Sequence, residues 1–158
     1  MHDVLVIYKQ IEMQFDEDGK LLPFNNNSVH TLSYDEKPGI QAIATTSEDR
    51  SPIPNTDTNS CHQRDYEYVR LGTLSLLAAI DLLSGEAIPL VSETHKSSDF
   101  VTFLKKVNEK YPKGDTIRII LDNHSAHTSK ETQEYLNTIP KRFEFVFTPK
   151  HGSWLNMI

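Results

Sequence analysis

The amino-acid sequence predicts an α/β domain in which a mixed β-sheet is flanked by helices. Three stretches carry this prediction. Residues 117–121 (IRIIL) are apolar on both faces apart from Arg118, which is typical of a central strand that is covered on both sides. Residues 97–111 show the apolar spacing of an amphipathic helix. Residues 73–91 contain two apolar runs around a Ser-Gly turn, which is the pattern of a β-hairpin.

The N-terminal part predicts a helix, a short strand and a long polar loop. Apolar side chains recur at helical spacing over residues 3–15, and DEDGK at 16–20 is a turn signal. We expect a short strand over residues 29–34 that ends at Asp35. Residues 44–65 are rich in Ser, Thr, Asn, Pro and Asp, a composition that predicts a long surface loop, partly disordered.

The middle of the chain predicts the hairpin and the clearest helix. Residues 73–81 form a buried strand, and residues 87–91 return as a second strand, whose Pro89 favours an edge position. The helix over residues 97–111 is expected to use Ser98 as its N-cap. Its apolar stripe consists of Phe100, Phe103, Leu104, Val107 and Tyr111.

The C-terminal part continues the alternation of strands and helices. After the apolar strand, residues 128–131 (TSKE) match a capping box, so a helix begins there, and Pro140 ends it. Residues 143–147 predict another strand, and residues 153–156 look like the start of a helix. The order of elements is therefore that of a mixed sheet.

Composition limits the class of protein. The chain has 158 residues, which suits one domain, and no apolar stretch approaches the roughly 20 residues that a membrane span needs. Its N-terminus lacks the features of a signal peptide, and its one cysteine, Cys61, suits a reducing compartment. We therefore expect a soluble, cytoplasmic protein. The net charge of −6 leaves DNA binding open without supporting it.

Polar residues follow the central strand. Asp122 comes directly after the apolar run, where ligands gather in open α/β sheets, but an Asp-Asn pair also simply opens turns. Asp35 ends the first expected strand, and as an isolated residue it would be an exposed loop acid. His124 and His127 have the spacing of a zinc pair, although the sequence shows no Cys or third His at partner spacing.

Four blocks of sequence together resemble a known family. They are DEKPGIQA (35–42), LSLLAAIDLLSG (74–85), ILDNHSAHTSKET (120–132) and FTPKHGSWLN (147–156). In this order they resemble the catalytic domain of DDE transposases from bacterial insertion sequences, which belong to the mariner-like superfamily. The resemblance extends from about residue 3 to residue 158, and four blocks in order are far more specific than any one of them.

The resemblance implies a ribonuclease H-like fold whose catalytic, metal-binding acids are Asp35 and Asp122. The complete site of the family holds two Mg²⁺ or Mn²⁺ ions, which suits the clamp of two hard cations that phosphodiester chemistry needs. The resemblance also implies supporting or DNA-contacting roles for Asn123, His124, His127, Lys150, His151, Trp154 and Asn156. As alternatives, Lys150 and His151 belong to a solvated loop and Trp154 to the core.

The family pattern sets the expected domain organisation. Residues 1–27 are expected to be a linker helix and turn, and residues 28–158 the catalytic domain, truncated at its C-terminus. The family's third acid is expected directly after Ile158, so no residue of this chain supplies it. The family's helix-turn-helix region is expected to be absent from this chain.

Three functions remain open from the sequence. The first is a catalytic-domain fragment of a cut-and-paste DNA transposase. Its partners would be the transposon ends and a TA-containing target, with a homodimer in the full-length protein. The second is an inactive fragment that only binds DNA or another transposase protomer. The third is a ribonuclease H-like, structure-specific nuclease.

Overall fold

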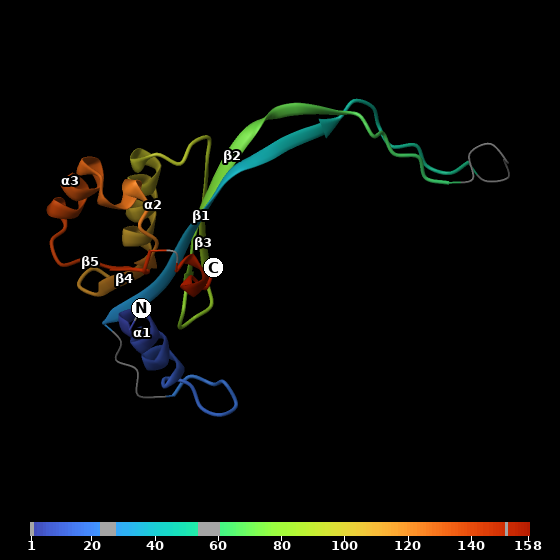
Figure 1. The fold of residues 1–158 in the computed structure, drawn as a ribbon. Coiled ribbons are helices and arrows are strands. Elements are labelled where there is room, and N and C mark those ends of the chain that lie inside the picture. The colour runs from blue at the N-terminus through green and yellow to red at the C-terminus, as the bar shows by residue number, and fades with distance from the viewer. Residues whose placement is uncertain (1, 23–27, 54–60, 151) are drawn as a thin grey trace.

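The computed structural model describes residues 2–22, 28–53, 61–150 and 152–158 (Figure 1). In chain order the elements are α1 (His2–Glu12), β1 (Val29–Thr45), β2 (Tyr68–Asp81), β3 (Ala87–Ser92), α2 (Ser97–Lys110), β4 (Thr116–Leu121), the short 3₁₀ helix η1 (Ser125–Thr128), α3 (Lys130–Thr138), β5 (Phe143–Phe147) and the short 3₁₀ helix η2 (Ser153–Leu155). No helix in these ranges is long and apolar enough to cross a membrane.

The strands form one five-stranded sheet in the order β3-β2-β1-β4-β5. β1, β2 and β3 are antiparallel neighbours, while β4 pairs in parallel with both β1 and β5. β3 lies at an edge, as Pro89 predicted, because proline cannot donate to a neighbouring strand. The predicted ribonuclease H-like mixed sheet flanked by helices is confirmed.

Alternate residues of β4 face two different apolar clusters. Ile117, Ile119 and Leu121 are fully buried against the stripe of α2, which is the stripe that the sequence predicted. Ile120 points to the other face and contacts a smaller cluster with Val4 of α1. The central strand is therefore covered on both faces, which explains why its sequence is apolar throughout.

β1 is much longer than the sequence predicted. The expected end at Asp35 is wrong, because β1 continues to Thr45, and its pairing with β2 runs from Leu32 to Thr45. The pairing shifts register between Lys37 and Ile40, where Pro38 has no N–H to donate and Gly39 has a φ of 68°. Residues 40–45 and 68–74 then leave the body as a two-stranded ribbon, which we call the arm (Figure 1).

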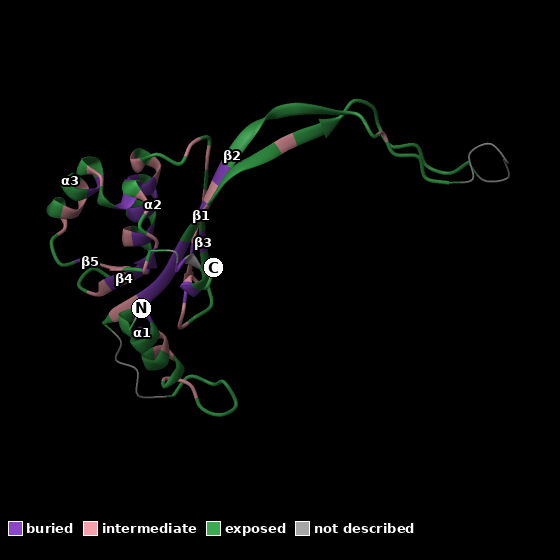
Figure 2. Cartoon of the chain, in the orientation of Figure 1, coloured by how far each residue is buried: buried purple, intermediate pink, exposed green. Residues whose placement is uncertain are grey.

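The arm is exposed on both faces (Figure 2). Beyond it, the expected polar loop is confirmed for residues 46–53 and 61–65, which are irregular apart from an isolated bridge between Arg50 and Gln63. The rest of that expected loop, residues 54–60, lies outside the described residues. Periodicity missed the arm because its strands have no continuously buried face.

The N-termini of the helices use different caps from those predicted. Lys96, and not Ser98, is the N-cap of α2, and its N–H donates to the carboxylate of Asp99 (2.8 Å). Ser92 donates to the same carboxylate (2.7 Å). Burial alone would raise the pKa of Asp99, but these hydrogen bonds and one from the Thr94 hydroxyl outweigh it and lower the pKa.

The cap of α3 also differs by one residue from the expected capping box. Ser129 is the N-cap, and its hydroxyl oxygen accepts the N–H of Thr132 (3.2 Å). Glu131 therefore does not close a box with Thr128. The buried Thr132 hydroxyl in turn donates to the carbonyl of Ala126 (2.8 Å), which links the first turn of α3 to η1.

Arg142 joins the beginning of β5 to the end of α2. Its guanidinium donates to the carbonyls of Pro112 (2.6 Å), Asp115 (2.5 Å), Tyr111 (2.8 Å) and Asn108 (3.1 Å). Its Nε donates to the side-chain oxygen of Asn108 (2.8 Å), and the residue is 9% exposed. The positive charge lies at the negative end of the helix, where it also satisfies carbonyls that have no partner within the helix.

Candidate functional site

Of the two predicted catalytic acids, Asp35 lies on β1, and Asp122 directly follows the parallel neighbour β4. Ser33 of β1 is paired with Ile120 of β4, and two residues further along each chain are Asp35 and Asp122. β4 ends there while β1 continues, so the acids lie at the same end of the parallel pair. This part of the prediction is confirmed, and a metal site shared by the two carboxylates stays a prediction.

Neighbouring residues of β1 face opposite sides of the sheet. Tyr34 packs against Phe103 of α2 and His127 of η1, and its hydroxyl donates to Glu36 Oε1 (2.8 Å). Asp35 faces a pocket of about 260 Å³ that Glu36, Lys37 and Ile158 also line. The predicted acid Asp35 therefore lies beside the C-terminal segment.

Asn156 fixes the path of that C-terminal segment. Its amide donates to the carbonyl of Tyr34, and its side-chain oxygen accepts the hydroxyl of Ser33. The N–H of Met157 donates to the same Ser33 hydroxyl (2.9 Å). Asn156 was predicted to support the site, and these bonds hold residues 156–158 against the part of β1 that carries Asp35.

The turn after β4 is held by its own polar residues. Asp122 Oδ1 accepts the N–H of His124 (2.9 Å). Asp122 therefore opens a turn, which was the alternative interpretation of the Asp-Asn pair. Its side chain nevertheless remains 45% exposed. Asn123 donates to the carbonyl of Thr148 at the end of β5 (2.6 Å). The turn is thereby tied to the next strand.

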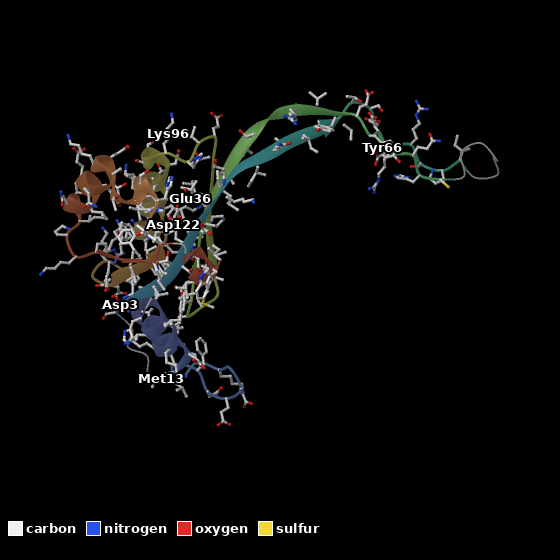
Figure 3. The ribbon with its side chains drawn as sticks, in the orientation of Figure 1. Asp3, Met13, Glu36, Tyr66, Lys96 and Asp122 are labelled. Atoms are coloured by element: carbon white, nitrogen blue, oxygen red, sulfur yellow. The ribbon has the colours of Figure 1, made fainter. Side chains whose placement is uncertain are left out.

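Glu36 brings the two histidines into a cluster that the sequence did not predict. The ligand atoms of Glu36, His124 and His127 all lie within 4.8 Å of one another. His127 Nε2 is 3.3 Å from Glu36 Oε1, and His124 Nδ1 is 3.7 Å from Glu36 Oε2. Figure 3 shows Glu36 and Asp122 in the body, near the point from which the arm departs.

His127 is the most buried member of this cluster. It is 1% exposed, and its ring packs at 4.5 Å, centroid to centroid, against Phe100. Burial lowers the pKa of His127 to about 4; Asp122, whose Oδ1 is 3.6 Å from Nδ1, acts in the opposite direction, and His124 lowers the pKa further. The ring is thus neutral near pH 7, and one nitrogen carries a free lone pair.

The remaining predicted site residues lie on the surface or outside the described ranges. Lys150 is exposed, and Trp154 is 71% exposed, so the alternative that Trp154 belongs to the core is wrong. His151 lies outside the described residues. In the described part of the chain, neither Asp35 nor Asp122 has a lysine or arginine within ion-pair distance.

Residues 35–158 match the family model described as DDE superfamily endonuclease. The chain belongs to this family. DDE endonucleases act with divalent metal ions, which agrees with two carboxylates at the same end of the parallel pair β1 and β4. The match begins at Asp35, so both predicted acids fall within it.

A relative from an insertion element supports the same assignment. The chain is 30% identical over 83 residues to the Insertion element IS630 uncharacterized 39 kDa protein of Shigella sonnei. The match covers 52% of this chain and 24% of that protein. With the family match, it confirms the predicted resemblance to the DDE transposases of insertion sequences. This chain is a DDE endonuclease domain of the transposase type.

Solved structures of complexes also match this chain, at low identity. The simian T-cell lymphotropic virus intasome in complex with the PP2A regulatory subunit B56 gamma matches with a TM-score of 0.49 and 16% identity, over 80% of this chain and 35% of that chain. The Mos1 transposase paired-end complex with the left transposon end matches with a TM-score of 0.40 and 10% identity, over 90% and 39%. The chain therefore spans well under half the length of these proteins.

Proposed function

We propose that this chain is the catalytic-domain part of a cut-and-paste DNA transposase, with Asp35 and Asp122 as the metal-binding acids. The single observation that carries the proposal is the parallel register that aligns these two residues at one end of the sheet. The match to the DDE endonuclease family over residues 35–158 supports the same reaction class.

The donor set suits Mg²⁺ or Mn²⁺. Both side chains offer carboxylate oxygens, which hard cations prefer, and both reach solvent, so that water can complete the coordination shell. Among the described residues neither carboxylate forms an ion pair with a lysine or arginine, so both can take up a cation. Two such ions, when bound, would stabilise the charge on the attacking and leaving oxygens of a phosphodiester.

Neighbouring residues hold this site in place. Asn123 fixes the turn that carries Asp122 by its bond to Thr148, and Asn156 fixes residues 156–158 beside β1. Because Ile158 lines the same pocket as Asp35, an acid placed directly after Ile158 would lie near the Asp35 carboxylate. This position suits the third acid that the sequence resemblance implies.

The same resemblance suggests the DNA partners. Transposon ends and a TA-containing target are the proposed substrates, with a homodimer as the proposed assembly of the full-length protein. An exposed Trp154 offers a face on which a base stacks, and the exposed Lys150 offers a cation for a phosphate. We expect both residues to contact DNA.

The test compares DNA nicking by three chains in Mg²⁺ on a duplex that carries the element's end. These are residues 1–158 alone, the same chain with an aspartate added directly after Ile158, and a matched chain with an added asparagine. We expect the aspartate extension to raise nicking by at least about 10²-fold, because one preorganised charge-stabilising group commonly contributes about 10²–10³ in rate. Asp122→Asn in the extended chain should abolish the gain.

Other outcomes decide between the remaining functions. Equal nicking by all three chains would overturn the assignment of the site. DNA binding without metal-dependent nicking, in the aspartate-extended chain as well, would favour the inactive binding module. Cleavage of an RNA–DNA hybrid in preference to the end-containing duplex would favour a ribonuclease H-like nuclease instead.

A further inference from the structure

The cluster of Glu36, His124 and His127 lies next to Asp122, whose Oδ1 is 3.6 Å from His127 Nδ1, and it does not include Asp35. Glu36 contacts Tyr34, His124 and His127, whereas its strand neighbour Asp35 contacts none of these three side chains. Three potential ligand atoms converge here within 4.8 Å. The cluster therefore offers a second set of possible metal ligands, which neighbours the proposed site of Asp35 and Asp122 but contains neither acid.

The buried nitrogens of this cluster lack hydrogen-bond partners among the described residues. They are Nδ1 of His124 and both ring nitrogens of His127, which is 1% exposed. Burying a polar group without a hydrogen bond is unfavourable, so such groups normally have a partner. Nε2 of His127 faces Glu36 Oε1 at 3.3 Å but does not form a hydrogen bond with it.

The spacing of these atoms fits a shared metal ion. Zinc ligands lie about 2.0–2.2 Å from the ion, so two ligands of a tetrahedral site are roughly 3.4 Å apart. His127 Nε2 and Glu36 Oε1 are 3.3 Å apart, and His124 Nδ1 and Glu36 Oε2 are 3.7 Å apart. Only small side-chain movements would bring all three ligands to one ion.

The chemistry of the ligands selects the kind of ion. Two imidazole nitrogens with one carboxylate oxygen suit Zn²⁺ and related transition metals, whereas Mg²⁺ takes oxygen ligands. We propose that Glu36, His124 and His127 bind one Zn²⁺ ion, at a site separate from Asp35. The partly exposed His124 lies on the solvent side, so that water can take the fourth position.

Asp122 would act as the outer partner of this site. Metal-bound histidines usually donate their second ring N–H to a carboxylate, which fixes the ring. His127 presents Nε2 to Glu36 and Nδ1 to Asp122, with Nδ1 3.6 Å from Asp122 Oδ1. A bound ion would therefore anchor the turn after β4 to β1, and would hold the Asp122 carboxylate in one orientation.

The experiment is a titration of metal-free residues 1–158 with Co²⁺, followed by visible absorption, and then with Zn²⁺, followed by calorimetry. We expect one equivalent of Co²⁺ to give the spectrum of a low-symmetry, nitrogen-containing site, and Zn²⁺ to displace it. Glu36→Gln and His124→Asn should each weaken Zn²⁺ binding at least about tenfold, because even the loss of an outer partner costs about 10–100-fold. These two variants spare the buried His127.

Two controls separate this site from the proposed DNA chemistry. His62→Asn removes a half-exposed imidazole outside the cluster and should leave Zn²⁺ affinity unchanged. Asp35→Asn should also leave Zn²⁺ affinity unchanged while it weakens Mn²⁺ binding. If Asp35→Asn leaves Mn²⁺ affinity unchanged, the result would count against the proposed function but not against the zinc site. Wild-type Zn²⁺ affinity in Glu36→Gln and His124→Asn, or an equal loss in Asp35→Asn, would overturn the zinc site.

Discussion

Replacing Arg142 by methionine should destabilise the domain more than the loss of any surface charge. The guanidinium donates to four backbone carbonyls and to the side chain of Asn108, and the residue is 9% exposed. Methionine fills a similar volume but donates nothing. The carbonyls at the end of α2 would then lose their partner while the surrounding residues continue to exclude water.

The expected cost follows from this count of acceptors. An acceptor left unsatisfied in a buried position costs about 1–3 kcal/mol, and such contributions do not add fully. If two of the four carbonyls remain shielded from water, Arg142→Met should lower the free energy of unfolding by about 3–5 kcal/mol. For a chain of this size, that loss corresponds to a fall in Tm of roughly 6–20 °C.

The assay is urea unfolding followed by circular dichroism, with Arg118→Met as the matched control. Arg118 pairs with the half-exposed Glu144 (3.0 Å), so its loss should cost no more than about 1 kcal/mol. Arg142→Lys should remain destabilised, because an ammonium cannot reach the carbonyls that the planar fork reaches. Equal midpoints for Arg142→Met and Arg118→Met would refute the reasoning.

Other perturbations test the core, a helix cap and the acids. Phe103→Ala should lower the free energy of unfolding by about 3–5 kcal/mol, since Phe103 is fully buried, whereas Leu71→Ala in the arm (67% exposed) should change it by less than about 0.5 kcal/mol in the same urea assay. Asp99→Ala should cost about 1–2 kcal/mol at neutral pH. Because the pKa of Asp99 is lowered in the fold, its contribution is present above about pH 4 and is lost below it, so the difference from wild type should shrink in acid-unfolding curves. Asp122→Asn should weaken Mn²⁺ binding in a calorimetric titration, and an unchanged affinity would remove Asp122 from the site.

Much of the body could be predicted because burial leaves a periodic trace in the sequence. The stripe of α2 and the apolar run of β4 each bury a continuous face, and both elements were predicted with nearly correct ends. The outer half of β1 could not be found in this way. Its residues are held by pairing with β2, while their side chains remain exposed, so no hydrophobic period marks them.

The candidate site also contains residues that the sequence could predict and residues that it could not. Asp35 and Asp122 were found through family motifs, and the strand register then placed them together. Glu36 was missed, because only the pairing of β1 with β4 brings it near two histidines that are almost ninety residues away in sequence. Arg142 was missed for a similar reason. Its partners are mostly backbone carbonyls, and no pattern of side chains records where those carbonyls point.

A single strand, β1, passes from a five-stranded body into a two-stranded arm. Its two parts should therefore differ in local stability. Two-stranded ribbons are marginally stable by themselves, so amide hydrogens beyond residue 40 should exchange through local opening, while those of residues 29–34 should exchange only when the whole domain unfolds. Asp35 and Glu36 lie where these two regimes meet. Motions of the arm are therefore transmitted first to the backbone of the residues that carry these carboxylates. A partner that binds the arm and makes it more rigid should also reduce the motion of Asp35 and Glu36.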